Sequence, residues 1–137
     1  MRTTLLAAIA ALLLASPFAF SQDPASDRTL SAQGDAEAGR TVFFRCQACH
    51  RVTGGARPLA GPNLDNIFGR MAGTSDTYPH YSKAVRESGI VWSEQALNQW
   101  MADPQNFLPG NKMPFAGVRS EQDRKDLLAF LRQATEN

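Results

Sequence analysis

Five consecutive residues, Cys46-Gln47-Ala48-Cys49-His50, decide the fold, because they form the C-x-x-C-H pattern by which a haem is attached covalently. Two thiols three positions apart lie on the same side of one turn of chain, where they react with two vinyl groups at one edge of a porphyrin. The following residue, His50, then lies beneath the iron as an axial ligand. The motif predicts one covalently attached haem c per chain, held by Cys46, Cys49 and His50.

Three other interpretations of the two cysteines remain open from the motif alone. A dithiol redox centre lies in a strand-helix-strand context, and the sequence has no convincing strand pattern. A zinc site needs two more ligands, and the chain offers no second cysteine pair and only one further histidine, His80. A structural disulfide suits an exported protein but gives no role to His50.

A six-coordinate iron needs a second ligand, and the candidates are Met71, Met101, Met113 and His80. The spacing of Met101 is typical of a helical core residue, and Met71 lies among small loop residues, so ordinary packing explains both. Met113 lies in an irregular loop, residues 109–117, whose prolines restrict the backbone. We therefore expect His50 and Met113 as axial ligands, with His80 as the alternative. This ligand pair raises the reduction potential and leaves no open coordination position.

The N-terminal 21 residues have the features of a secretory signal peptide. An apolar run from Leu5 to Leu14 is shorter than the roughly 20 residues of a membrane-spanning helix. Small residues at Ala19 and Ser21 suit cleavage after residue 21. We expect export to the periplasm without stable membrane insertion, and the alternative is a leader retained as an anchor. Residues 22–34 are polar and predict a flexible arm, which leaves residues 35–137 as the folded domain.

The composition favours one compact domain of nearly neutral charge. Loss of residues 1–21 removes one base and no acid, so the 14 basic and 13 acidic residues become 13 and 13. This balance gives no support to nucleic-acid binding. Three of the bases are lysines and eleven are arginines. A cationic docking surface would therefore consist mainly of arginine, and Arg45, Arg51 and Arg57 are the candidates near the cysteines.

Helical periodicity predicts an all-α domain of about four to five helices with long loops around the haem. The predicted helices begin at Asp35, near Tyr81, after Ser93 and after Ser120, where both serines suit an N-cap. Pro104 is expected to end the third helix. The loops 53–62 and 104–117 are long for a domain of this size, and a large ligand that completes the core explains them.

Several short motifs follow one another along the chain: Gly39-x-x-x-Phe43, Cys46-x-x-Cys49-His50, Gly61-Pro62-Asn63-Leu64, Phe68-Gly69-Arg70, Trp92, Lys112-Met113-Pro114-Phe115-Ala116-Gly117 and Leu127 to Leu131. In this order they resemble class I cytochromes c, from Asp35 to the C-terminus. The resemblance implies a cytochrome c fold and a one-electron carrier that is monomeric and is not an enzyme. It also implies redox protein partners, namely a membrane-bound donor and an oxidase, reductase or periplasmic dehydrogenase as acceptor.

The same resemblance implies roles for four further residues of the haem site. The carbonyl of Pro62 would accept a hydrogen bond from His50 and so orient the ligand ring. Arg70, Tyr81 and Trp92 would hydrogen-bond or neutralise the haem propionates. The implied cofactor-binding set is Cys46, Cys49, His50, Pro62, Arg70, Tyr81, Trp92 and Met113, with His50 and Met113 as the metal ligands.

The chain departs from this family pattern near the methionine ligand and in its lysine content. Trp100 replaces a tyrosine that is common near the methionine sulfur, and Asn111 replaces a threonine before Lys112. The lysine-rich docking ring of mitochondrial members is missing. A rival function is an enzyme or sensor in which peroxide, nitric oxide or a sulfur substrate displaces Met113, although the sequence shows no obvious catalytic base beside the haem.

Overall fold

A computed structural model of the protein describes residues 26–136. The described part contains helices and loops, and its one β-type pairing is an isolated antiparallel bridge between Met71 and Val91. The prediction of an all-α fold is confirmed, and none of the described helices is long and apolar enough to cross a membrane. The predicted signal peptide lies outside the described residues. The helices are α1 (Ala36–Phe43), α2 (Lys83–Glu87), α3 (Glu94–Ala102), α4 (Pro104–Phe107) and α5 (Glu121–Thr135), preceded by the 3₁₀ helices η1 (Ser26–Arg28) and η2 (Ser31–Gln33).

Polar side chains begin three of these helices at the positions that the sequence indicates. Asp35, Ser93 and Ser120 each accept hydrogen bonds from backbone N–H groups in the first turn of α1, α3 and α5. These donors have no partner inside a helix, so the caps satisfy groups that would otherwise depend on water.

The short helix α4 was not expected from the sequence. Pro104 ends α3 as predicted, but it also occupies the first turn of a new helix, where its fixed φ angle is favourable and its missing N–H costs nothing. The side chain of Asp103 caps this turn by accepting from the backbone N–H of Asn106 at 3.1 Å. Part of the predicted loop 104–117 is therefore helical.

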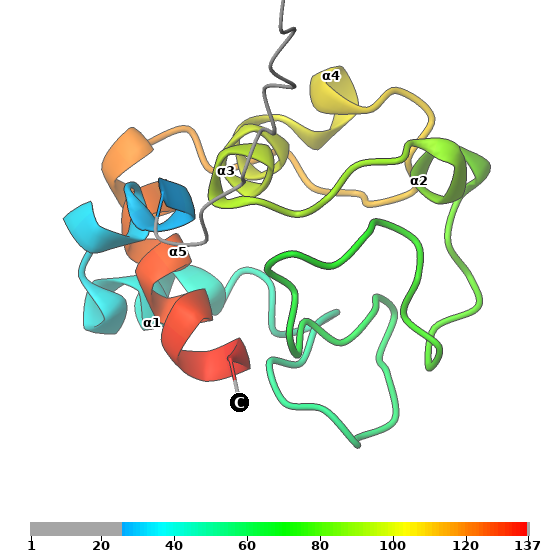
Figure 1. The fold of residues 1–137 in the computed structure, drawn as a ribbon, viewed down its shortest axis with the longest axis horizontal. Helices are drawn as coiled ribbons and strands as arrows, with labels where there is room; N and C mark the ends of the chain where they lie inside the picture. Colours follow the sequence, from blue (N-terminus) through cyan, green and yellow to red (C-terminus); the bar gives the residue numbers. More distant parts are fainter. Residues whose placement is uncertain (1–25, 137) are drawn as a thin grey trace, which may run out of the picture.

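The crossing of α1 and α5 forms the rigid side of the molecule (Figure 1). The two helices touch backbone to backbone at Gly39, where a Cβ atom would lie 1.9 Å from the carbonyl oxygen of Asp126. The rings of Phe43 and Phe130 pack beside this point with centroids 5.2 Å apart. This close crossing explains why the Gly39-x-x-x-Phe43 motif has a glycine in a helix that glycine otherwise weakens.

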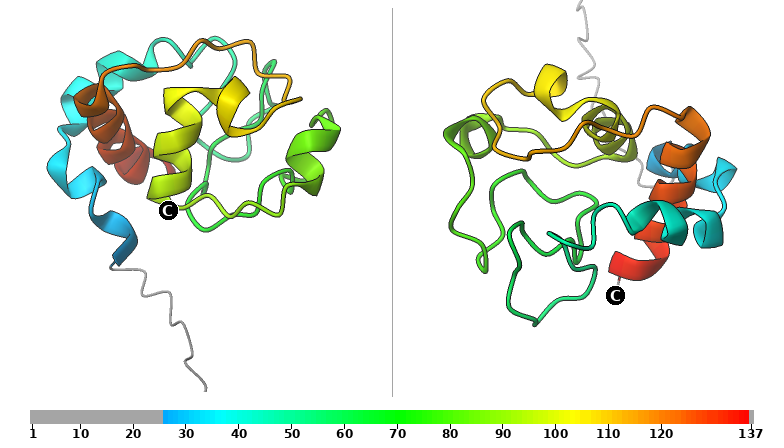
Figure 2. Two further views of the ribbon diagram at one scale, coloured as in Figure 1. Left: turned by 90° about the horizontal axis from the view of Figure 1, so that it is seen from above. Right: turned by 180° about the vertical axis from the view of Figure 1, so that it is seen from behind.

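The described part of the segment before α1, residues 26–35, contains two short 3₁₀ helices that contact the rest of the domain. Its two 3₁₀ helices pack on α3 and α5 (Figure 2). Gly34 lies so close to α5 that a Cβ atom would be 2.1 Å from the carbonyl oxygen of Lys125. The polar residues of the segment bind buried charged groups of α3 and α5, a partnership between distant residues that local composition does not reveal.

Long loops form the opposite side of the molecule, and Figure 2 shows them facing α3 and α4. One loop region is stiffened by the pairing of residues 69–72 with residues 90–92. The backbone N–H of Gly69 donates to the carbonyl of Trp92 at 3.0 Å, and that of Trp92 donates to the carbonyl of Arg70 at 2.9 Å. These pairs hold two side chains of the candidate site on one short ladder.

Candidate functional site

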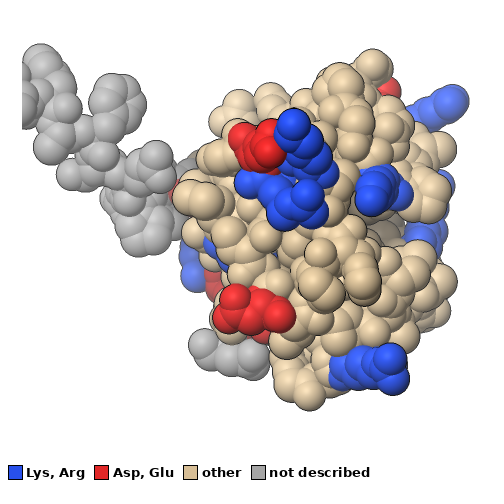
Figure 3. All heavy atoms as spheres, turned by 90° about the vertical axis from the view of Figure 1, so that its right-hand side faces the viewer, with Lys and Arg blue, Asp and Glu red and all other residues tan. Residues whose placement is uncertain are grey.

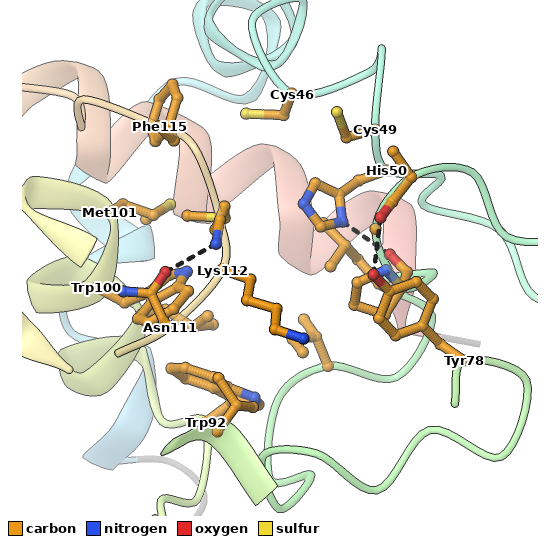
Figure 4. A pocket seen from close by; sticks show the side chains of 18 of the residues that line it. Cys46, Cys49, His50, Tyr78, Trp92, Trp100, Met101, Asn111, Lys112 and Phe115 are labelled. Carbon is orange, nitrogen blue, oxygen red and sulfur yellow. Dashed lines mark hydrogen bonds between the residues drawn. The ribbon is translucent and has the colours of Figure 1, made fainter. Parts of the chain in front are cut away.

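A mostly apolar cavity of about 300 Å³ lies between the cysteine turn, the loops and α3. Figure 4 shows Cys46, Cys49 and His50 on one side of it and Trp100, Met101 and Asn111 on the other. The structure brings all eight residues of the predicted haem site to this single cavity. Its lining includes Cys46, Cys49, His50, Pro62, Arg70, Tyr81, Trp92 and Met113.

The cysteine motif forms a single turn after α1. The carbonyl of Cys46 accepts from the backbone N–H of Cys49 at 3.0 Å and from that of His50 at 2.9 Å. This turn places both thiols on the cavity wall, as the motif requires. Burial raises the pKa of the Cys46 thiol, and the nearby charge of Arg45 opposes this effect.

The ring of His50 is held in place by the backbone of the loop at Gly61 and Pro62. Its Nδ1 atom lies 2.8 Å from the carbonyl oxygen of Pro62. Since a carbonyl oxygen only accepts, Nδ1 carries the proton and Nε2 keeps a lone pair for a metal. Gly61 packs against the ring, where a Cβ atom would lie 2.5 Å from Cε1 of His50. Burial lowers the pKa of His50 despite the bond to Pro62, which favours the neutral, coordinating form.

Both backbone groups of Met113 are held by side chains. Its N–H donates to Oδ1 of Asn111 at 2.9 Å, and its carbonyl accepts from Nε2 of Gln105 at 2.9 Å. The amide nitrogen of Asn111 in turn donates to the carbonyls of Pro104 and Leu108 at 2.8 and 2.9 Å. Asn111, a departure from the family pattern, therefore locks the loop that presents the thioether.

The other candidate ligands differ in how they meet the cavity. Met101 lines it but is a core residue of α3, 8% exposed. His80 also lines it and is exposed to solvent. Met71 is 51% exposed, pairs with Val91 and is not part of the lining. The structure thus removes Met71 from the candidates and leaves Met113 as the methionine on an irregular, side-chain-held loop.

The predicted propionate residues lie on one part of the wall. The guanidinium of Arg70 donates to the carbonyls of Asp65 at 2.9 Å and Asn63 at 3.0 Å, which fixes a positive charge at the cavity. Trp92 is 7% exposed and belongs to the same ladder as Arg70. Burial raises the pKa of Tyr81, and the nearby charge of Arg70 opposes this effect.

Sequence reasoning missed two residues that shape the site. The hydroxyl of Tyr78 donates to the carbonyl of Ala60 at 2.7 Å and joins two loops on the side of the cavity where His50 lies (Figure 4). Gln105 holds the carbonyl of Met113 from the start of α4. The aromatic residue Tyr78 in a polar loop was a detectable signal, whereas Gln105 could not be found without knowing that α4 exists.

The second departure from the family pattern, Trp100, adds an aromatic wall. Its ring packs edge to face with Trp92 at 5.4 Å and with Phe107 at 6.2 Å between centroids. The indole of Trp100 stands where the family commonly has the phenol of a tyrosine. Because the indole is larger and less polar, this side of the cavity is less polar.

The comparisons with known proteins identify the family. Residues 36–135 match the model of the cytochrome c family. The chain is 41% identical to cytochrome c of Gossypium barbadense over 103 residues, which are 74% of this chain and 92% of the relative. It is 42% identical to cytochrome c2 of Blastochloris viridis over 103 residues, or 75% and 80% of the two chains. The solved structure of cytochrome cH from Methylobacterium extorquens superposes with a TM-score of 0.68 at 38% identity, covering 73% of this chain and 99% of that one. The chain belongs to the cytochrome c family, as a class I monohaem cytochrome and electron carrier that binds haem c covalently.

Proposed function

We propose that the protein shuttles single electrons through a haem c attached at Cys46 and Cys49, with His50 and Met113 as the axial ligands. Haem c supplies an iron that alternates between the ferric and ferrous states. The observation that carries this proposal is the convergence of His50 and Met113 on one mostly apolar cavity, where His50 is hydrogen-bonded to the carbonyl of Pro62 and Met113 to the side chain of Asn111.

The residues around His50 keep its coordinating nitrogen in one orientation and one protonation state. The carbonyl of Pro62 retains the proton on Nδ1, and the absent side chain at Gly61 leaves room for the ring. A ligand that does not rotate or titrate during turnover changes little between the two oxidation states. Little reorganisation favours fast electron transfer.

The loop around Met113 has the same effect on the other side of the cavity. Asn111 and Gln105 fix the backbone on both sides of the residue, so the thioether returns to the same position after any fluctuation. Thioether ligation favours ferrous iron and raises the reduction potential. Since both axial positions are then filled by protein, the arrangement supports a carrier over an enzyme that binds a substrate at iron.

The propionates are assigned to Arg70, Tyr81 and Trp92. The charge of Arg70 compensates negative charge at the cavity, and the hydroxyl of Tyr81, whose pKa is raised by burial, is available as a hydrogen-bond donor. Both effects permit anionic groups to lie in a largely apolar site, where an unpaired charge would be costly.

The charge distribution around the cavity supports docking to acidic redox partners. Arg45 and Lys112 are exposed and line the cavity, and Lys112 reaches across it in Figure 4. Figure 3 shows basic side chains around a hollow on the face of the molecule that carries the loops. Such a surface attracts an acidic partner at long range and gives short-lived complexes that weaken with salt. The partners we propose are a membrane-bound donor and an oxidase, a reductase or a periplasmic dehydrogenase as acceptor, each met by a monomer.

We assign the protein to the periplasm on the leader sequence alone, residues 1–21. Sequencing the N-terminus of the protein purified from a periplasmic extract tests this assignment. A chain that begins at Gln22 supports it, and recovery with the membrane fraction indicates the retained anchor instead.

The test of the axial ligands compares three methionine variants of the haem-loaded protein. Met113→Ala should abolish the weak methionine-to-iron band at the red end of the ferric spectrum, lower the reduction potential and permit rapid carbon monoxide binding. Met101→Leu and Met71→Leu are matched controls that should retain the band. A band that survives in Met113→Ala, or full and rapid carbon monoxide binding by the unmodified ferrous protein, would exclude the proposed site.

A further inference from the structure

The first residue of α3, Glu94, is a buried carboxylate satisfied by the segment before α1. Glu94 is 1% exposed. Its Oε2 atom accepts from the backbone N–H groups of Leu30 and Ser31, both at 3.0 Å, and Oε1 bonds to the hydroxyl of Ser31. Burying a carboxylate is unfavourable unless it is paired and hydrogen-bonded. Residues 30 and 31 thus contribute three of the donors that make this position stable.

Arg132 of α5 completes the network. Its Nε atom lies 2.9 Å from Oε1 of Glu94, and one terminal nitrogen lies 2.7 Å from Oδ2 of Asp27. Oδ1 of Asp27 accepts from the backbone N–H of Glu94 at 2.8 Å, which closes the ring of interactions. The face of the guanidinium covers the ring of Phe68 at 3.7 Å from its centroid.

Two members of this network are close in sequence to the cavity wall. Arg70 and Trp92 line the cavity. Phe68 lies two residues before Arg70, and Glu94 lies two residues after Trp92. Arg70 and Trp92 are joined by the backbone ladder of residues 69–72 and 90–92. The network therefore holds residues that adjoin both segments of this ladder, Phe68 just before residues 69–72 and Glu94 just after residues 90–92.

We propose that residues 26–34 are a positioning segment, which acts through Glu94 and Arg132 to hold the Arg70 and Trp92 wall and thereby raises the reduction potential of the haem. The segment precedes residues 36–135, which match the family model, so this role does not follow from membership of the family. The inference rests on the proposed function, because it requires a haem with a measurable potential in this cavity.

The direction of the effect follows from electrostatics. A tightly held wall keeps water away from the haem and keeps the positive charge of Arg70 beside it. Both conditions disfavour the ferric state, which carries one more positive charge than the ferrous state, and so both raise the potential. Loosening the segment should therefore lower the potential. Simple removal of the negative charge of Asp27 would do the opposite, because it would favour the ferrous state.

The test is a redox titration of haem-loaded Asp27→Asn and Ser31→Ala, compared with the unmodified protein. Glu37→Gln is the matched control, since Glu37 is an acid of α1 whose side chain is 84% exposed and pairs with exposed Arg40 at 3.7 Å. We expect a lower potential in both test variants, and an unchanged or higher potential in the control. Loss of the negative charge of Asp27 alone would raise the reduction potential. A lower potential in Asp27→Asn would therefore show that the wall has been loosened.

Ser31→Ala changes no charge and removes one hydroxyl, so it decides the question if Asp27→Asn fails to fold. Potentials in the test variants that equal that of the unmodified protein, or that rise as in Glu37→Gln, overturn the inference and leave the segment a purely structural element. If the unmodified protein itself shows no reversible one-electron couple, the proposed function fails instead, and the two failures are therefore distinguishable.

Discussion

The crossing of α1 and α5 gives a quantitative prediction for Gly39→Ala. In the structure, the added Cβ atom would lie 1.9 Å from the carbonyl oxygen of Asp126, about 1.5 Å short of the 3.4 Å at which ordinary contact begins. The obstacle is the backbone of α5, which cannot rotate away as a side chain does. The two helices must therefore separate, and the contact between Phe43 and Phe130 loosens with them.

Two opposing terms set the size of the effect. Alanine in place of glycine within a helix contributes about 1 kcal/mol of favourable propensity. Overpacking at a close contact costs roughly 1–3 kcal/mol, and a clash with backbone lies at the upper end of that range. We expect Gly39→Ala to lower the free energy of unfolding by about 2 kcal/mol, which corresponds to a fall in Tm of roughly 10 °C in a domain of this size.

The assay is urea unfolding of the haem-loaded protein, followed by far-ultraviolet circular dichroism. Ala38→Gly is the matched control, because Ala38 is the exposed preceding residue of α1 and its replacement costs only the propensity, about 1 kcal/mol. The two variants should have similar m-values and clearly different midpoints of urea unfolding. A Gly39→Ala protein as stable as the unmodified one, or more stable, would show that the helices do not meet at this glycine.

Three further predictions concern the site. Asn111→Ala removes the bonds to Met113, Pro104 and Leu108, so we expect a loss of about 2 kcal/mol in unfolding free energy and a weaker methionine-to-iron band; an unchanged band would contradict the role of Asn111. Gly61→Ala forces a Cβ atom against His50, so unfolding free energy should fall by roughly 1–3 kcal/mol and ferric high-spin absorption should increase. Burial raises the pKa of Tyr81, so the folded state holds this proton more tightly and stability should decrease as the pH rises above about 10. Unfolding at a series of alkaline pH values should show a smaller decrease in Tyr81→Phe.

The sequence predicts the elements that depend on local rules. The N-caps at Ser93 and Ser120 are present because each follows from residue types within a few positions of one another. The glycine of the Gly39-x-x-x-Phe43 motif marks the helix crossing, although the contact itself joins Gly39 to the distant residue Asp126. All eight residues of the predicted haem site line one cavity. The residue pattern indicated Cys46, Cys49, His50 and Met113, and the family resemblance implied Pro62, Arg70, Tyr81 and Trp92.

The features that were not predicted depend on contacts between distant parts of the chain. The polar composition of residues 26–34 predicted an arm and gave no sign that the backbone N–H groups of Leu30 and Ser31 and the hydroxyl of Ser31 bind Glu94, more than 60 residues away in the sequence. Gln105 reaches Met113 only because α4 begins at Pro104, and the proline was interpreted only as the end of α3. In both cases, the residue type permitted two local structures, and a tertiary partner selected one.

We expect the two sides of the molecule to determine different properties, namely the stability of the fold and the reduction potential of the haem. Around the cavity, side chains that bind loop carbonyls, such as Tyr78 on Ala60, add to the short backbone ladder of residues 69–72 and 90–92. On the other side, α1 and α5 hold the domain by close packing. Substitutions in the helix crossing should therefore change stability with little effect on potential, whereas substitutions in the loop bonds should change both. The network of Glu94 and Arg132 is where the two sides meet, since it joins α3 and α5 to the ladder behind the cavity. A variant there should show whether packing far from the haem is transmitted to its potential.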